Sequence, residues 1–413
     1  MRCEAPTVRD ESVAQSSCRG FLYTREFHDG VWRRRHLICL SSRVLAAPFL
    51  YLTGGVAMAH LEKFDSPYLY IEREEFKMFT RILGVLLCAL FISPGSSMAS
   101  DRSGEVELAV TIAAPDDSKD VRVWIPYPVS DNVQDISNVR ISGNFSQSGI
   151  YGEKETGNLA LYAEWTTPTK DRAITLTFDA TARELIKKDF PAVEPAIPVE
   201  IKEHLKSTTF IPTDGKVREI ALSVTNDKQM ISEKARAVYR WVVENMTRDP
   251  DVKGCGTGEV EIQIVKRSGK CADISSVFVS IARAAGVPAR EVFGLRLGKK
   301  DDEDMTGGHH CWSEFYVPGY GWVPADAADV RKIMLVEELD LKGAQDHIDY
   351  YFGGVDQYRI ALARGGRGYY LNPRQNDGPL NYFMYPYAEV NGKSLDWLAA
   401  QTDLKYKVKF KAH

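Results

Sequence analysis

Apolar residues recur at helical spacing in the middle of the chain. They occupy one face of a segment that starts near Cys271 and include Ile274, Val277, Phe278, Ile281, Ala282 and Ala285. A period of three to four residues predicts a helix over this segment. Gly286 ends the helix, and Pro288 keeps it from restarting. Similar helical patterns run through 220–245.

Short strand-like segments follow this helix. Residues 291–297, 311–317 and 322–324 are rich in apolar and aromatic side chains, which indicates strands. Pro318-Gly319-Tyr320-Gly321 supplies a turn between the last two. A helix followed by antiparallel strands predicts an α+β core, to which we assign residues 199–332.

The flanking regions have different patterns. Residues 100–190 contain alternating segments, at 105–112, 121–125 and 173–178, which predict an N-terminal antiparallel β domain of the sandwich kind. A proline-rich connector, 191–198, leads into the core. Residues 333–413 gather Tyr and Phe beside Gly, Asn and Pro. We expect this part to be a C-terminal extension or β-rich cap on the core, with lining of a substrate groove as a secondary role.

A leader-like segment precedes these domains. Met78 to Arg81 leads into the apolar run 82–92, and small residues at Ser97 and Ala99 follow. This order is typical of a secretory signal peptide over 78–99, and the run is too short to span a bilayer comfortably. Residues 1–77 show no sustained period, so we interpret them as an over-extended N-terminus. We therefore expect an exported protein, periplasmic or secreted, with no stable membrane anchor after signal cleavage.

Composition narrows the class of protein. The 413 residues are 44% hydrophobic and 26% charged, which is enough for two or three globular domains. A formal net charge of −4 is unfavourable for a nucleic-acid partner, and we expect none. The seven cysteines do not form a disulfide framework. Only Cys255, Cys271 and Cys311 would remain after signal cleavage, so at least one thiol would stay free.

Cys271 is the first candidate for chemistry. It lies where a loop becomes a helix, and the positive end of the helix dipole favours the thiolate form of a cysteine. A thiolate nucleophile needs a base, and the base needs an orienting carboxylate. His310 begins one predicted strand and Asp326 ends the next, which would place them close together in a hairpin.

Four sequence blocks resemble the transglutaminase-like superfamily. They are Gly269-Lys270-Cys271, Gly286-Val287-Pro288-Ala289-Arg290, His310-Cys311-Trp312 and Gly321-Trp322-Val323-Pro324-Ala325-Asp326. The family pattern is Gly-x-Cys, Gly-Ile/Val-Pro-Ala-Arg, His-x-Trp and Gly-Trp-x-Pro-x-Asp, and the blocks occur in that order within 230–332. The resemblance implies a papain-like core with Cys271 as nucleophile, His310 as base and Asp326 as orienter. Ala327 departs from the proline that is common after the aspartate.

Several neighbours compete for these roles. The His-x-Trp spacing selects His310 over His309, because adjacent strand residues face opposite sides. By the same rule Cys311 should point away from the site, into the core. Asp329 should be solvated or capping, because its spacing from Trp322 does not fit. A zinc cluster of Cys255, Cys271, His309, His310 and Cys311 is disfavoured, since no Cys-x-x-Cys pair exists and neighbouring strand residues diverge. We expect no metal and no cofactor.

The oxyanion donors are the least defined part of the site. The resemblance implies that the backbone N–H of Cys271 is one donor. An aromatic or amide side chain upstream would be the second, for which Trp241 and Asn245 are candidates, although Trp241 could equally be a core residue. The loop Gly254-Cys255-Gly256-Thr257-Gly258 lacks the ending of a phosphate-binding loop.

These features predict a cysteine enzyme that transfers an acyl group from an amide or peptide bond. Water as acceptor would make it a protease or amidase, and a lysine amine would make it a cross-linking transglutaminase. We favour hydrolysis, because members of this superfamily that look bacterial often lack the accessory domains of animal cross-linking enzymes. The substrate would be a protein, a peptide or another amide. The same residues are also compatible with a non-catalytic binding protein on this fold or with a zinc-dependent hydrolase.

Overall fold

The computed structural model describes residues 25–28, 31–34, 101–398 and 401–413. The chain divides into two compact units, 1–93 and 94–413. In the first unit, strands β1 (Arg25–His28) and β2 (Val31–Arg34) pair antiparallel, although the sequence pattern indicated no strand there. The expected signal segment 78–99 lies outside the described residues. Among the described helices, none has the length and apolar character that crossing a membrane requires.

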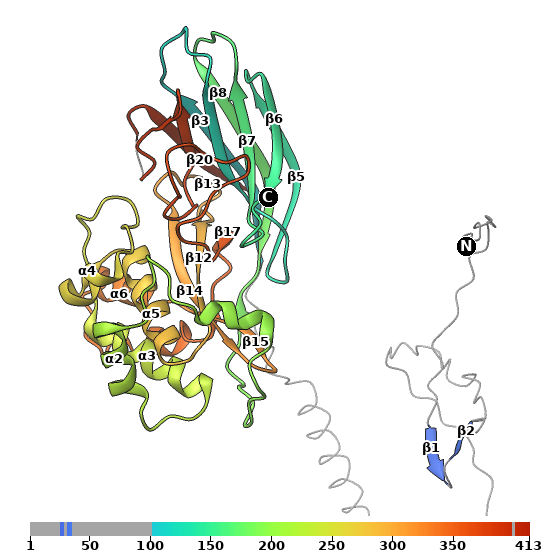
Figure 1. Ribbon diagram of the computed structural model, residues 1–413, viewed down its shortest axis with the longest axis vertical. Helices are drawn as coiled ribbons and strands as arrows, with labels where there is room; N and C mark the ends of the chain where they lie inside the picture. Colours follow the sequence, from blue (N-terminus) through green and yellow to red (C-terminus); the bar gives the residue numbers. More distant parts are fainter. Residues whose placement is uncertain (1–24, 29–30, 35–100, 399–400) are drawn as a thin grey trace, which may run out of the picture. The chain divides into compact units, whose positions relative to one another are not determined.

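A β-sandwich built from two five-stranded sheets forms one end of the second unit (Figure 1). The first sheet consists of β13 (Asp302–Asp304), β20 (Leu404–Ala412), β3 (Arg102–Ile112), β8 (Arg172–Ala182) and β5 (Gln134–Gly143), in that order. The second consists of β19 (Lys393–Ser394), β18 (Tyr387–Val390), β4 (Val121–Tyr127), β7 (Leu159–Trp165) and β6 (Gln147–Gly152). All their pairings are antiparallel.

Strict alternation explains why these strands bury one face. In β3, Val106, Leu108 and Val110 are buried, while Glu105 and Glu107 between them are partly exposed. Because strand side chains alternate between the two faces, the apolar set points between the sheets. There it packs with apolar residues from the second sheet into one core. The expectation of an N-terminal β-sandwich is confirmed in its architecture.

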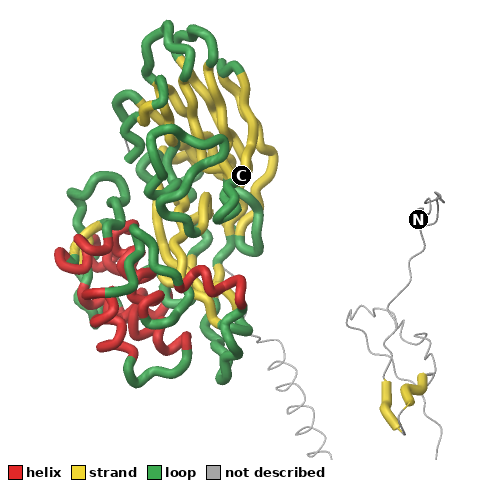
Figure 2. The backbone as a smooth tube through the Cα atoms, viewed as in Figure 1, coloured by secondary structure: helices red, strands yellow, loops and turns green. Residues whose placement is uncertain are grey.

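The other part of the second unit is a cluster of helices beside a four-stranded sheet (Figure 2). The sheet order is β15 (Gly321–Ala325), β14 (His309–Val317), β12 (Ala289–Arg296) and β17 (Arg359–Arg364), all antiparallel. The helices are α2 (Gly215–Thr225), α3 (Ile231–Asn245), α4 (Val260–Lys266), α5 (Cys271–Ala284), α6 (Ala327–Val336) and α7 (Gln345–Tyr350). The predicted α+β class is confirmed, and the helical pattern at 220–245 corresponds to two helices, α2 and α3.

Short elements join these parts. They are the 3₁₀ helix η1 (Val199–Leu205), the parallel pair β10 (Thr247–Arg248) and β11 (Ser268–Gly269), and the antiparallel pair β9 (Leu185–Ile186) and β16 (Gly354–Val355). Helix α5 lies at the centre of the core, and nearly all its side chains are buried against β14, β12 and the other helices. That position accounts for a composition dominated by small and apolar residues.

The C-terminal segment 333–413 is woven into the rest of the unit, which corrects the expectation of an extension or cap. Strand β20 pairs with β3 along nine residues, β18 pairs with β4, and β17 pairs with β12 of the core sheet. Each of the three larger sheets therefore contains a strand from this segment. Its aromatic residues, such as Tyr382 and Phe383, are buried in cores.

Candidate active site

Cys271 is the first residue of α5, and a carboxylate fixes the start of that helix. Asp273 accepts hydrogen bonds from the backbone N–H of Lys270 at 2.9 Å and of Gly258 at 2.8 Å. The first bond caps α5, as an acidic side chain in a first turn often does. The second ties the preceding loop to the same helix start. The Cys271 thiol is therefore held at a helix N-terminus, as the sequence predicts.

Glycine is required in that loop at Gly256. Its φ is +90°, and a Cβ atom added there would lie 2.0 Å from an oxygen of the Asp273 carboxylate. Only a residue without a side chain lets the loop approach this closely. The neighbouring Cys255 accepts a hydrogen bond from the backbone N–H of Ala272 at 2.9 Å through its carbonyl oxygen. This contact brings a second cysteine next to the first turn of α5.

His310 and Asp326 meet as the sequence predicts. Strands β14 and β15 are antiparallel neighbours, and Asp326 follows directly after β15. His310 Nε2 hydrogen bonds with Asp326 Oδ2 at 2.7 Å, and both side chains are almost completely buried. Because Nε2 faces the carboxylate, Nδ1 is the ring nitrogen left for other partners.

Asp326 also caps the helix that follows it. Its Oδ1 accepts a hydrogen bond from the backbone N–H of Asp329 at 2.9 Å at the start of α6. Its Oδ2 additionally accepts a hydrogen bond from Arg359 Nη1 at 2.6 Å. These three contacts fix the carboxylate from three sides. Its orientation relative to His310 is therefore determined by the backbone and by a buried cation.

Asp329 is buried and ion-paired, so the expectation of a solvated side chain was wrong. It lies 3% exposed in the first turn of α6, binds Arg296, and accepts a hydrogen bond from Arg359 Nη2 at 2.9 Å. Its Oδ1 is 3.6 Å from His310 Nε2, beyond hydrogen-bond distance. Burial raises the pKa of Asp329, but His310, Arg296 and Arg359 hold it far below its ordinary value. Asp329 supplies charge beside the imidazole.

Arg359 is the residue of this site that sequence reasoning missed. It lies on β17, directly opposite Arg296 on β12. Like charges at opposed strand positions repel each other, so the pair requires the carboxylates of Asp326, Asp329 and Asp356 between them. A single arginine at the start of the strand segment Arg359-Ile360-Ala361-Leu362-Ala363-Arg364 carries no spacing signal that would link it to Asp326.

The electrostatics favour a charged pair of Cys271 and His310. Hydrogen bonding from Cys255, followed by that from Cys311 and by His310, outweighs burial and holds the pKa of Cys271 well below its usual value. Burial and Arg296 lower the pKa of His310, but the Asp329 and Asp326 carboxylates raise it by more. Shifts in these two directions stabilise a thiolate beside an imidazolium.

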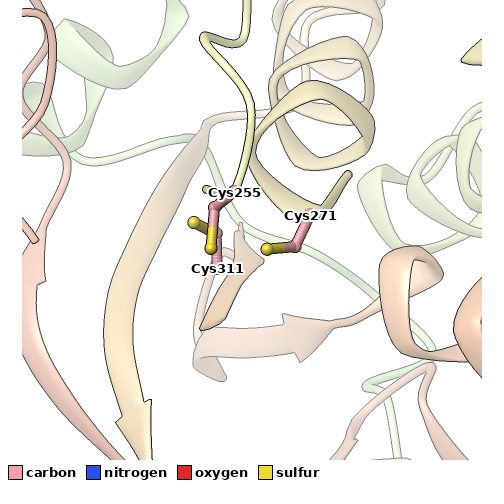
Figure 3. A group of neighbouring side chains, drawn as sticks. All are labelled: Cys255, Cys271 and Cys311. Atoms are coloured by element: carbon pink, nitrogen blue, oxygen red, sulfur yellow. The ribbon is translucent and has the colours of Figure 1, made fainter. Parts of the chain in front are cut away.

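Two expectations about neighbouring side chains have different outcomes. Cys311 is buried, as expected, but its sulfur lies within 4.8 Å of the sulfurs of Cys271 and Cys255, so it does not point away from the site (Figure 3). His309 packs against Tyr385 and Tyr406, at ring-centre distances of 4.7 and 5.6 Å, and is not hydrogen-bonded to Asp326. The strand direction therefore separates the two histidines, as the His-x-Trp spacing predicts.

The second oxyanion donor stays a prediction. The Asn245 side chain donates to the backbone oxygen of Trp241 at 2.9 Å and accepts from Arg267 at 3.1 Å, so its amide is engaged at the end of α3. Trp241 is half-buried, with the Arg267 guanidinium 5.6 Å from its ring centre. The Cys271 backbone N–H lies in the first turn of α5, where such groups have no partner within the helix.

An antiparallel sheet and a central helix thus place a cysteine, a histidine and an aspartate together in a buried site. Residues 218–327 match the model of the transglutaminase-like superfamily. Over 302 residues the chain is 34% identical to an uncharacterized protein of Haemophilus influenzae, covering 66% of this chain and 82% of that protein. The chain belongs to the transglutaminase-like superfamily.

More distant similarities cover other lengths of the chain. A 128-residue stretch is 28% identical to the uncharacterized protein YebA of Bacillus subtilis, covering 26% of this chain and 17% of that protein. A candidate cysteine protease from Cytophaga hutchinsonii aligns in structure with a TM-score of 0.45 and 14% identity, over 76% of this chain and 99% of that one. The periplasmic domain of TgpA from Pseudomonas aeruginosa aligns with a TM-score of 0.32 and 15% identity, over 60% and 93%.

Proposed function

We propose that this protein is a hydrolytic cysteine enzyme, a protease or amidase, in which Cys271, His310 and Asp326 form the catalytic triad. The observation that carries the proposal is the buried hydrogen bond of 2.7 Å between His310 Nε2 and Asp326 Oδ2, next to a thiol at a helix start. This arrangement supplies a nucleophile, a proton carrier and an orienting group, the parts that acyl transfer through a thioester needs.

The reaction follows from these roles. The Cys271 thiolate attacks the carbonyl carbon of an amide, and the negative charge moves to the carbonyl oxygen. The C–N bond then breaks, the His310 imidazolium gives its proton to the departing amine, and a thioester remains on Cys271. His310 next takes a proton from water, the hydroxide attacks the thioester, and the released sulfur returns to thiolate. Asp326 keeps the imidazole in the required orientation throughout.

A cavity of about 270 Å³ adjoins the charged network around His310, and its lining, which includes none of the three triad residues, is both polar and apolar. Its walls include Arg296 and Asp329, which belong to the charged network around His310. They also include Lys332. Burial lowers the pKa of Lys332, and the charge of Cys271 opposes this shift. Apolar side chains, among them Met305 and Ile333, complete the lining. A peptide or another amide of mixed polarity fits such walls better than a purely apolar molecule.

Labelling with an activity probe and turnover of amide substrates test the proposal. Purified protein should be labelled at Cys271 by a thiol-directed activity probe and should turn over members of a panel of peptide, glutamine and cell-wall amides. Cys271→Ala should do neither, with an unchanged melting temperature as the control for folding. Release of a free carboxylate supports hydrolysis, whereas incorporation of a fluorescent primary amine would make the enzyme a transglutaminase. An intact thiolate with no turnover on the panel would favour a non-catalytic binding protein.

We also propose that the protein is exported, on the strength of the signal-like segment 78–99. A gene beginning at Met78 should yield secreted or periplasmic protein with a mature N-terminus at or near Ser100. Amino-terminal sequencing of the native protein checks this. Recovery of residues from 1–77 would contradict both the signal peptide and the over-extended N-terminus.

A further inference from the structure

Three cysteines that are far apart in the sequence converge on one buried point. Cys255 comes from the loop between α3 and α4, Cys271 from the start of α5, and Cys311 from β14 (Figure 3). Their sulfur atoms all lie within 4.8 Å of one another, and the three residues are 5%, 2% and 0% exposed. All three thiols are free. The acyl-transfer reaction uses only the sulfur of Cys271 as nucleophile, and the other two thiols act on that reaction only by lowering the pKa of Cys271.

The spacing of the sulfurs fits a tetrahedrally coordinated soft ion. Zinc binds thiolates at about 2.3 Å, so two sulfurs on the same ion lie roughly 3.8 Å apart. Contraction of each sulfur pair by no more than about 1 Å would therefore form three of the four bonds. Cys255 lies on a loop outside the sheet ladders, with left-handed backbone at Gly254, Gly256 and Gly258.

An unpartnered histidine beside the cluster is the second observation. His309 lies two residues before Cys311 on β14, so the two side chains share a face of the strand. It is 8% exposed, and neither ring nitrogen makes a hydrogen bond. The Thr306 backbone lies near enough to act on its pKa but without normal hydrogen-bond geometry. Buried polar atoms normally find partners, and this unpartnered imidazole belongs to the residue whose backbone oxygen accepts a hydrogen bond from the Cys255 thiol at 3.4 Å. Imidazole nitrogen is a common ligand for zinc.

We propose that Cys255, Cys271 and Cys311 form a binding site for a thiophilic divalent ion of the zinc type, with the unpartnered imidazole of His309 as the candidate fourth ligand. Binding displaces the protons of the Cys255 and Cys311 thiols, whose pKa values are raised, and a divalent cation at the centre compensates two of the three resulting charges. When the metal ion is bound, the Cys271 sulfur is one of its ligands. The bound state is then an inhibited form of the proposed enzyme, from which a chelator restores the nucleophile.

Cadmium, which absorbs in the ultraviolet when bound to thiolates, is the probe for the site. Reduced full-length protein should bind one Cd²⁺ per chain, with a charge-transfer band of the strength given by three thiolates, and Zn²⁺ should displace it. Cys255→Ser and Cys311→Ser should each reduce the band to that of two thiolates. Each substitution should weaken Cd²⁺ binding by at least about 100-fold. The reason is that losing a residue that only hydrogen-bonds to a metal ligand already lowers metal affinity by about 10- to 100-fold. His413→Gln, which removes an exposed histidine at the chain end, is the matched control and should bind like the wild type.

Melting temperatures establish that the variants fold. If Cys311→Ser does not fold, wild-type protein alkylated at Cys271 provides the two-thiolate comparison. The proposal is overturned if the reduced protein shows no thiolate band, or if Cys255→Ser and Cys311→Ser bind Cd²⁺ as tightly as the wild type. It is also overturned if Cys255 and Cys271 are joined in a disulfide when the protein is purified with Zn²⁺ present.

The readout is independent of the proposed hydrolysis. A protein that binds Cd²⁺ through three thiolates but cleaves no amide supports the metal site and contradicts the enzyme. A protein that hydrolyses amides but shows no thiolate band with Cd²⁺ supports the enzyme and contradicts the metal site. When both hold, stoichiometric Zn²⁺ should abolish turnover, and a chelator should restore it.

Discussion

Exchanging Asp326 for asparagine separates the orientation of His310 from the stability of the buried charge network. In Asp326→Asn, the side-chain oxygen can still cap α6 by accepting from the Asp329 N–H. The amide NH₂ group would then face His310 Nε2 and Arg359 Nη1, where Asp326 Oδ2 now accepts from both. A donor facing two donors leaves the imidazole without its orienting bond.

The expected loss of turnover is large. Removing the orienter from a triad of this kind costs on the order of 10⁴ in turnover, equivalent to about 5.4 kcal/mol in activation free energy. The expected loss of stability is smaller, because Arg359 keeps Asp329 and Asp356 as partners. Turnover of the best amide from the substrate panel, measured together with thermal unfolding, gives both quantities for the same preparation.

Asp329→Asn is the matched control and should show the opposite balance. It removes the carboxylate that pairs with both Arg296 and Arg359, and loss of one partner from a buried ion pair costs roughly 3–5 kcal/mol in unfolding free energy. Its oxygen is 3.6 Å from His310 Nε2, so turnover should fall much less than in Asp326→Asn. If folded Asp329→Asn is inactive while Asp326→Asn retains turnover, the orienter is Asp329 and the assignment of the hairpin is wrong.

Three further outcomes follow from the site. His310→Ala should abolish turnover, whereas His309→Ala should lose far less, since only His310 contacts Asp326; the reverse ranking would mean that the wrong histidine was chosen. Because the pKa of Cys271 is depressed, its thiolate forms at lower pH than in an ordinary thiol and disappears as pH falls through that lowered value. A small alkylating reagent should therefore modify Cys271 faster than Cys255 or Cys311 at neutral pH, and mass mapping of the labelled peptides measures the three rates. If Cys271 is modified most slowly of the three, it is not a thiolate. Gly256→Ala should lower the melting temperature, since its Cβ would lie 2.0 Å from the Asp273 carboxylate; an unchanged melt would contradict this contact.

The sequence was sufficient for the parts of the fold that depend on local pattern. The helix beginning at Cys271 and the strands that carry His310 and precede Asp326 follow from periodicity and turn residues, and the structure places them where the pattern predicts. A short turn joins β14 and β15, so the pairing of these two strands also depends on residues that are close together in the sequence. Local signals thus locate the three residues of the proposed triad.

The contacts that sequence reasoning missed all join distant parts of the chain. Arg359 reaches Asp326 only because β17 pairs with β12, and periodicity contains no information about which strands become neighbours. From the sequence, a cluster containing Cys255 and Cys311 is disfavoured because no Cys-x-x-Cys pair exists, yet the loop and the strand converge on α5. The strand alternation rule correctly separated His309 from His310. It failed for Cys311, whose sulfur lies within 4.8 Å of that of Cys271.

Strand β20 makes completion of the sandwich depend on a segment far along the chain. Because β20, Leu404–Ala412, lies between β13 and β3 in its sheet, the sandwich lacks an interior strand until these residues have been synthesised. Contacts between such distant segments form late and slow folding. Arg359, which fixes Asp326, likewise follows the nucleophile by nearly ninety positions in the chain. A growing chain on the ribosome would therefore carry Cys271 before the arginine that fixes Asp326 has been synthesised.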